Sequence, residues 1–232
     1  MNALRTRASW AASACVAAAH AAGASVIIPD QPRPALQALA DHVHEYAVLV
    51  TAGADETGVS GVLIGDGLVL TELRAVVSQD LRGVVVKEDI RVVAAGARVA
   101  ARMIAAAPDA NVAVLQLAAG ADSSRAPALA AGPAEAGDPL LAVRASLGGP
   151  ATILYDAVEV RIEPGTSAGE PPRMRAALPA GFAGAPVFDA RGDLAGLNVM
   201  ITDTIGVLIP AEALRRLIAR VHAHPGRGFN PG

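Results

Sequence analysis

Cysteine, tryptophan and lysine are each present only once in this 232-residue chain. The cysteine is Cys15 and the tryptophan is Trp10, both close to the N-terminus, and the lysine is Lys87. One thiol cannot form an internal disulfide, and a cysteine-ligated zinc site needs several thiolates. The sequence therefore excludes a disulfide framework and a cysteine zinc site. It also excludes a cysteine nucleophile once the first residues have been removed.

Strong charge of either sign is also lacking. The chain has 22 acidic and 19 basic residues and a net charge of -3 at pH 7. A nucleic-acid partner is normally matched by clustered basic charge, so none is expected. Beyond the N-terminus no apolar run reaches the roughly 18 residues that suggest a membrane-spanning helix. The histidine pairs at 42/44 and 222/224 have no acidic cluster around them, so we predict no metal and no cofactor.

The N-terminus has the layout of a secretory signal peptide. Arg5 and Arg7 give a positive start, an apolar stretch rich in alanine covers residues 8–19, and small residues suitable for cleavage follow. We predict removal of residues 1–24 and export to the periplasm or the medium. Two alternatives remain: an ordinary helix rich in alanine, and a lipoprotein leader that would tether Cys15.

Short strands separated by turn residues dominate the rest of the chain. Residues 65–67, Gly-Asp-Gly, are typical of a hairpin turn between two apolar strands. Residues 118–137 are rich in Ala, Gly, Pro and Ser and suggest a connection between two halves. Leu214 and Leu217 lie on one face of a closing helix predicted over residues 211–221. We therefore expect two all-β lobes, barrels or sandwiches.

The expected organisation has seven parts. They are a signal peptide (1–24), a lead-in segment and helix (25–45), a first β-barrel lobe (46–117), an inter-lobe linker (118–137), a second β-barrel lobe (138–210), a C-terminal helix (211–224) and a tail (225–232).

Four segments, in order, resemble the HtrA/Deg-type, trypsin-like serine proteases of the chymotrypsin fold. Residues 60–71 resemble the family's G-S-G strand, hairpin and L-T strand. Residues 108–117, PDANVAVLQL, resemble D-x-D-L-A-V-L-K. Residues 181–189, GFAGAPVFD, resemble G-N-S-G-G-P-L-x-D. Residues 192–210 resemble G-x-V-I-G-I-N followed by G-F-A-I-P. The resemblance implies an all-β fold with two barrels, a short N-terminal helix and a C-terminal helix.

The same resemblance places the catalytic triad at three positions whose residues cannot carry out its chemistry. The family's histidine corresponds to Arg74, its aspartate to Asn111 and its nucleophilic serine to Ala183. A guanidinium has no acceptor and stays protonated, so Arg74 cannot act as a general base. An alanine methyl cannot attack a carbonyl. The resemblance therefore implies a catalytically degenerate member, a pseudoprotease.

Five residues around the old active site are candidates for binding. Gly181, Phe182, Ala183 and Gly184 form the former oxyanion loop, whose backbone N–H groups would suit an anion or a carbonyl. Phe182 would wedge into the cleft or floor it. Arg175, on the preceding strand, would line the old specificity pocket and prefer an acidic group.

The expected function is the binding or scaffolding of an extended peptide or protein, since the cleft of this fold pairs a substrate strand by β-augmentation. Two alternatives remain: an active serine endopeptidase with a misaligned or non-standard triad, and a regulatory subunit that pairs with an active protease. The latter would form a mixed oligomer.

Overall fold

The computed structural model describes ten stretches of the chain, and the fold is given for these alone. They are residues 34–53, 55–80, 83–94, 96–119, 125–149, 152–163, 173–174, 178, 181–200 and 206–224. The predicted signal peptide, Cys15, Arg175 and the predicted tail at 225–232 lie outside the described residues.

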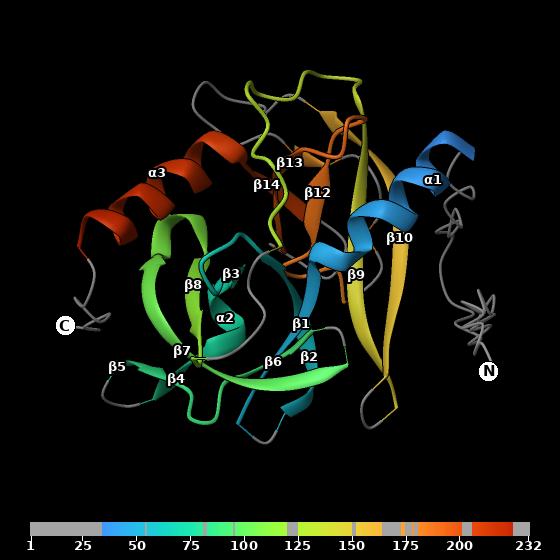
Figure 1. The fold of residues 1–232 in the computed structure, drawn as a ribbon. Helices are drawn as coiled ribbons and strands as arrows, with labels where there is room; N and C mark the ends of the chain where they lie inside the picture. The colour runs from blue at the N-terminus through green and yellow to red at the C-terminus, as the bar shows by residue number, and fades with distance from the viewer. Residues whose placement is uncertain are drawn as a thin grey trace, which may run out of the picture.

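The first half of the chain closes into a six-stranded antiparallel barrel (Figure 1). Its strand order is β1-β2-β3-β8-β7-β6. The predicted hairpin joins β2 to β3, and Gly65, Asp66 and Gly67 all adopt positive φ angles there. Glycine adopts such angles without steric cost, and aspartate tolerates them better than most residues. The strands are β1 (Ala47–Ala52), β2 (Asp55–Leu63), β3 (Leu68–Glu72), β6 (Arg91–Ala94), β7 (Ala97–Ala107) and β8 (Val112–Leu117).

The second half forms another closed six-stranded barrel, in the order β10-β11-β14-β13-β12-β9. β9 and β10 pair along most of their length and form the long ribbon seen in Figure 1. The strands are β9 (Pro139–Gly149), β10 (Thr152–Glu163), β11 (Arg173–Met174), β12 (Pro186–Phe188), β13 (Leu194–Met200) and β14 (Gly206–Pro210). The predicted double barrel of the chymotrypsin type is confirmed.

Short helices and a small hairpin complete the described fold. α2 follows β3 directly and packs against the first barrel, and the β4–β5 hairpin follows α2. Among the described residues, no helix has both the length and the apolar character needed to cross a membrane. The remaining elements are α1 (Pro34–Val43), η1 (His44–Tyr46), α2 (Leu73–Val76), β4 (Val77–Asp80), β5 (Gly83–Val86), η2 (Pro108–Ala110) and α3 (Ala211–Ala223).

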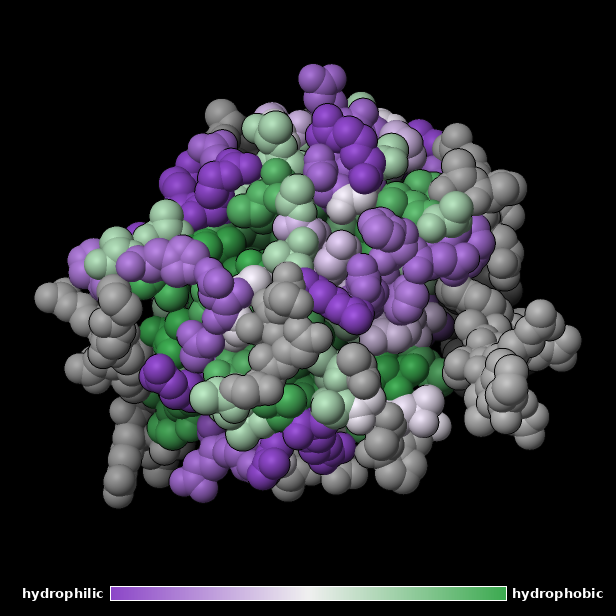
Figure 2. Space-filling model, viewed as in Figure 1, coloured by the Kyte–Doolittle hydropathy of each residue, from purple (hydrophilic) through white to green (hydrophobic). Residues whose placement is uncertain are grey.

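One hydrophobic cluster joins the two barrels. Leu70 and Val114 of the first barrel belong to the same buried cluster as Leu141 and Phe188 of the second. The closing helix adds Leu214 to it. Figure 2 shows hydrophobic side chains beneath α3, where the helix passes over the first barrel. Because this apolar surface is removed from water only when the halves pack together, it holds them in a fixed arrangement.

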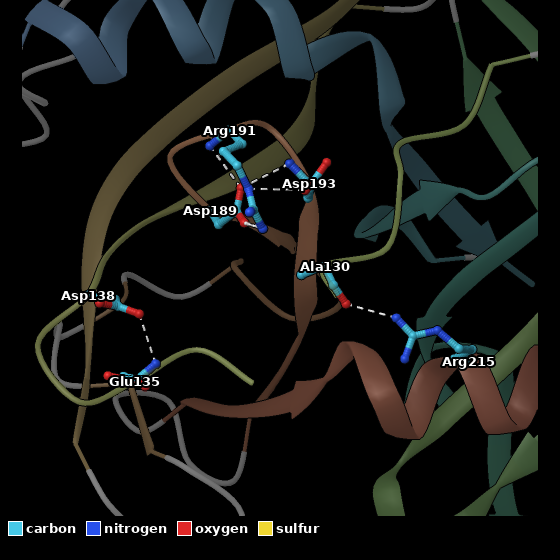
Figure 3. A network of polar contacts seen from close by, with 7 residues as sticks. All are labelled: Ala130, Glu135, Asp138, Asp189, Arg191, Asp193 and Arg215. Carbon is cyan, nitrogen blue, oxygen red and sulfur yellow. Dashed lines mark hydrogen bonds and ion pairs between the residues drawn. The ribbon is translucent and has the colours of Figure 1, made fainter. Parts of the chain in front are cut away.

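Polar contacts tie α3 and the connecting segment to the second barrel (Figure 3). Arg215 of α3 donates to the carbonyl of Ala130 at 2.8 Å. The neighbouring N–H of Ala130 donates to Leu194 of β13 at 3.0 Å. In the turn between β12 and β13, Arg191 pairs with both Asp189 and Asp193. The two contacts of Ala130 fix the segment between the barrels on the side of β13.

Candidate functional site

A small pocket lies where residues of the first barrel meet the loop that precedes β12. Its volume is about 160 Å³. Arg74 and Ala183, two of the three positions expected to carry the triad, both line it. Its described lining also includes two charged groups that the sequence analysis did not select, Glu72 and Lys87. The described residues of the lining are Val50, Ala52, Gly58, Val59, Glu72, Arg74, Ala75, Lys87 and Ala183.

Asn111 joins this site by holding the start of α2. Its backbone carbonyl accepts from the N–H of Leu73 at 2.9 Å, and its side-chain Oδ1 accepts from the N–H of Arg74 at 3.3 Å. These are the first two N–H groups of the helix, which have no partner within it. Asn111 reaches them because it adopts a left-handed conformation (φ 52°) at the end of the short helix η2, which asparagine tolerates well. Arg74, Asn111 and Ala183 thus belong to one neighbourhood.

Glu72 is the central polar residue of the site. It is buried, with 4% of its surface exposed. Asn111 donates its side-chain N–H to Oε1 of Glu72 at 2.8 Å, and the backbone N–H of Met200 approaches Oε2 at 3.5 Å. Met200 belongs to β13, so the carboxylate connects the two barrels. An amide at position 111 is what allows this arrangement, because a carboxylate there would have no proton to donate.

Burial raises the pKa of the Glu72 carboxyl above its usual value. The hydrogen bonds from Asn111 and Met200 and the positive charge of Arg74 partly oppose this rise. Loss of hydration disfavours the charged form, whereas donors and a nearby cation favour it. The sequence analysis missed Glu72 because a single acidic residue after an apolar strand usually lies in solvent. The one available signal was its position, two residues before Arg74.

The loop with Ala183 is fastened to the first barrel. The carbonyl of Ala183 accepts from the N–H of Ser60 at 3.0 Å. Gly184, at φ +68°, leaves so little space that a Cβ atom there would lie 2.1 Å from the Ser60 carbonyl oxygen. Only glycine fits such an approach. On the other side, the N–H of Gly184 donates to Asn198 of β13 at 2.9 Å.

Phe182 lies in the core of the second barrel, not in the lining of the pocket. Its exposure is 1%, and the guanidinium of Arg144 lies 5.4 Å from the ring centre. With Phe182 packed inward, Ala183 takes the position facing the pocket. Within the described part of the chain, the N–H groups of Gly181 and Ala183 donate to no acceptor.

The described lining of the pocket contains no hydroxyl or imidazole. Ser60 is fully buried; its Oγ accepts from the N–H of Ala145 at 3.0 Å and sits 3.4 Å from the Ala145 carbonyl. His44 stacks at a tilt on Tyr155, and His222 lies 3.8 Å from Asp66. Over the described ranges, no group of three or more His, Cys, Asp and Glu residues is arranged to hold a metal ion.

Several solved protease structures have the same fold. The Rv3671c protease of M. tuberculosis in its active form aligns with a TM-score of 0.66 and 19% identity, over 93% of this chain and 97% of that one. An inactive mutant form of it aligns at 0.63 and 21%, over 88% and 100%. A serine endoprotease from Yersinia pestis aligns at 0.64 and 19%, over 85% and 70%. At these identities the likeness shows the fold alone. No curated protein matches the sequence.

The family itself is shown by the sequence. Residues 59–197 match the trypsin-like peptidase domain, and this range holds most of both barrels and every residue of the pocket except Val50, Ala52 and Gly58. The two closed barrels, the pocket at their junction and this match agree. The chain belongs to the family of trypsin-like peptidase domains.

Proposed function

We propose that this protein is a non-hydrolysing member of its family that binds an extended peptide at the junction of the two barrels. The observation that carries the proposal is the composition of the pocket. Ala183 and Arg74 line it together, and its described lining contains no hydroxyl, thiol or imidazole. Such a pocket offers charge and shape to a ligand but no nucleophile.

The chemistry of the three positions supports the loss of hydrolysis. Loss of the nucleophile costs on the order of a millionfold in kcat in a serine protease of unrelated fold that uses the same chemistry. Asparagine in place of the triad aspartate costs about 10⁴-fold even where the histidine is present. Here Arg74 occupies the position of the base, and a guanidinium cannot accept a proton near neutral pH. Asn111 is engaged in holding α2 and Glu72 instead.

Binding of an extended peptide is supported by the free donors of the loop and by analogy with the fold. The N–H groups of Gly181 and Ala183 are available to a carbonyl or an anion. Proteins with exposed strand edges commonly recognise extended peptides through backbone hydrogen bonds. Arg175, which lies outside the described residues, remains part of the proposed binding region, whereas Phe182 and Gly184 are buried and only shape the loop.

Export is part of the proposal and rests on residues 1–24, whose charge and apolar pattern match a signal peptide. Expression of the full chain in a bacterium with two membranes, followed by N-terminal sequencing of the periplasmic protein, tests it. We expect a new N-terminus near residue 25. An intact N-terminus in the cytoplasm would contradict export.

The activity test compares the purified protein with a variant that restores the triad, Arg74→His with Asn111→Asp and Ala183→Ser, and that also carries Glu72→Gln so that two carboxylates do not face each other. Each is incubated with labelled casein and with a fluorophosphonate probe. We expect no labelled serine in the natural protein and a labelled residue 183 in the variant. Specific labelling of any serine in the natural protein would overturn the proposal in favour of an active endopeptidase with a non-standard triad.

A further inference from the structure

We infer that the pocket binds a carboxylate of the peptide, either its C-terminal carboxyl group or the side chain of an aspartate or glutamate. The inference rests on the proposed function, since it names the chemical class of the ligand at the same site. It follows from the hydrogen bonds that engage the Glu72 carboxylate and from the cations Arg74 and Lys87, which form no ion pair among the described residues.

Two cations line the pocket, and neither forms an ion pair within the described chain. Arg74 is exposed and Lys87 is half-buried. Among the described residues, neither side chain has a carboxylate within 4.0 Å. By contrast, the arginines at 91, 125, 144, 161, 191 and 216 are all in ion pairs. The site therefore keeps two available cations beside one small cavity.

The single carboxylate of the pocket is directed toward the protein. Oε1 of Glu72 faces the side-chain amide of Asn111 and Oε2 faces the backbone of Met200. Since donors from both barrels take up its oxygens, Glu72 does not close an ion pair with Arg74. With two cations and one anion, the described part of the lining has an excess of positive charge.

The loop adds a neutral donor to this charge. Ala183 lines the pocket, and its N–H has no acceptor among the described residues. A guanidinium presents parallel N–H groups that fit the two oxygens of a carboxylate, and such charged hydrogen bonds are stronger than neutral ones. A volume of about 160 Å³ accommodates a carboxylate with a short stem, since it is about five times the share of one liquid water.

Three fluorescent peptides derived from one neutral sequence test the inference, and fluorescence anisotropy measures their binding. The first has a free C-terminal carboxylate, the second is amidated, and the third is amidated but contains one aspartate. We expect one or both carboxylate peptides to bind at least about tenfold more tightly than the neutral amide. The stronger of the two identifies the source of the carboxylate.

Variants connect the preference to the pocket. Arg74→Gln and Lys87→Gln should each reduce the preference for the carboxylate toward that of the neutral amide. Arg98→Gln is the matched control, because Arg98 is an exposed arginine on β7 of the same barrel and outside the pocket. It should keep the preference, which shows that general surface charge is not responsible.

A second measurement uses Lys87, the only lysine of the chain. An amine-reactive acetylating reagent modifies Lys87, and mass spectrometry of the fragment that contains it gives the extent. A bound carboxylate peptide should protect Lys87, and the neutral amide at equal concentration should protect it less.

The outcomes separate the inference from the proposed function. Equal binding of all three peptides, unchanged by Arg74→Gln, would overturn the inference and leave peptide binding in place. Binding of none of them at millimolar concentration would overturn both. A carboxylate preference that survives both pocket variants would place the ligand elsewhere and overturn the inference.

Discussion

Replacing Asn111 by aspartate should destabilise the protein at neutral pH, even though aspartate is the residue that the family's triad requires there. In the structure Nδ2 of Asn111 donates to Oε1 of Glu72 at 2.8 Å. In Asn111→Asp, two carboxylate oxygens would meet at that distance. At an effective dielectric constant of about 20, two unit charges so close repel by about 6 kcal/mol.

The variant can avoid this repulsion by keeping one proton on the pair. Holding a proton at pH 7.5 on a carboxyl with an ordinary pKa of 4.5 costs about 4 kcal/mol, at roughly 1.36 kcal/mol per pH unit. The cost is smaller here because burial already raises the pKa of Glu72. Because keeping one proton on the pair costs less free energy than leaving both carboxylates charged, we expect a loss of about 3 kcal/mol in the free energy of unfolding at pH 7.5.

The pH dependence has a definite sign. The folded variant binds a proton that the unfolded chain releases, so its stability relative to the natural protein rises as the pH falls. Urea unfolding at pH 7.5 and pH 5.0 measures this, and most of the loss should disappear at the lower pH. Adding Glu72→Gln to Asn111→Asp removes the second charge and should recover much of the stability at pH 7.5. A single variant within about 0.5 kcal/mol of the natural protein at both pH values would refute the reasoning.

Two further predictions concern Glu72 and Gly184. Burial raises the folded-state pKa of Glu72, so its carboxyl contributes stability at low pH and loses it as the pH rises through that pKa. As the pH falls from 7.5 to 4, the free energy of unfolding of the natural protein should therefore rise relative to that of Glu72→Gln. Denaturant unfolding across that range measures this difference, and the opposite slope would contradict the prediction. Gly184→Ala should lower stability by about 3 kcal/mol or more, because the new Cβ would lie 2.1 Å from the carbonyl oxygen of Ser60. Gly132→Ala is the matched control, since a Cβ there meets nothing within 4 Å, and thermal unfolding should show a large fall in Tm for the first variant alone.

Local patterns predicted much of the fold. The hairpin lies at residues 65–67, between β2 and β3, where the Gly-Asp-Gly turn placed it. The closing helix begins at Ala211 as its apolar spacing predicted, although it continues to Ala223. These elements were predictable because period and turn chemistry are encoded within a few neighbouring residues.

The polar interior of the site was not predictable in the same way. The role of Glu72 depends on its hydrogen bonds with Asn111 and Met200, and neither residue is its neighbour in sequence. Phe182 was expected at the cleft because it replaces a small residue in the family's motif, but the structure packs it in the second core. A pattern shows that a residue is apolar or charged; it does not show which side of a loop faces inward.

The position of Glu72 also bears on the order in which the chain folds. Its contact with Asn111 spans 39 residues and can form within the first barrel, whereas its contact with Met200 spans 128 residues. The second contact requires nearly the whole chain to have been synthesised and the second barrel to have closed. Contacts that link distant parts of a chain form late and slow folding. The pocket is therefore one of the last features to be completed, and a ligand that binds there would stabilise only the finished molecule.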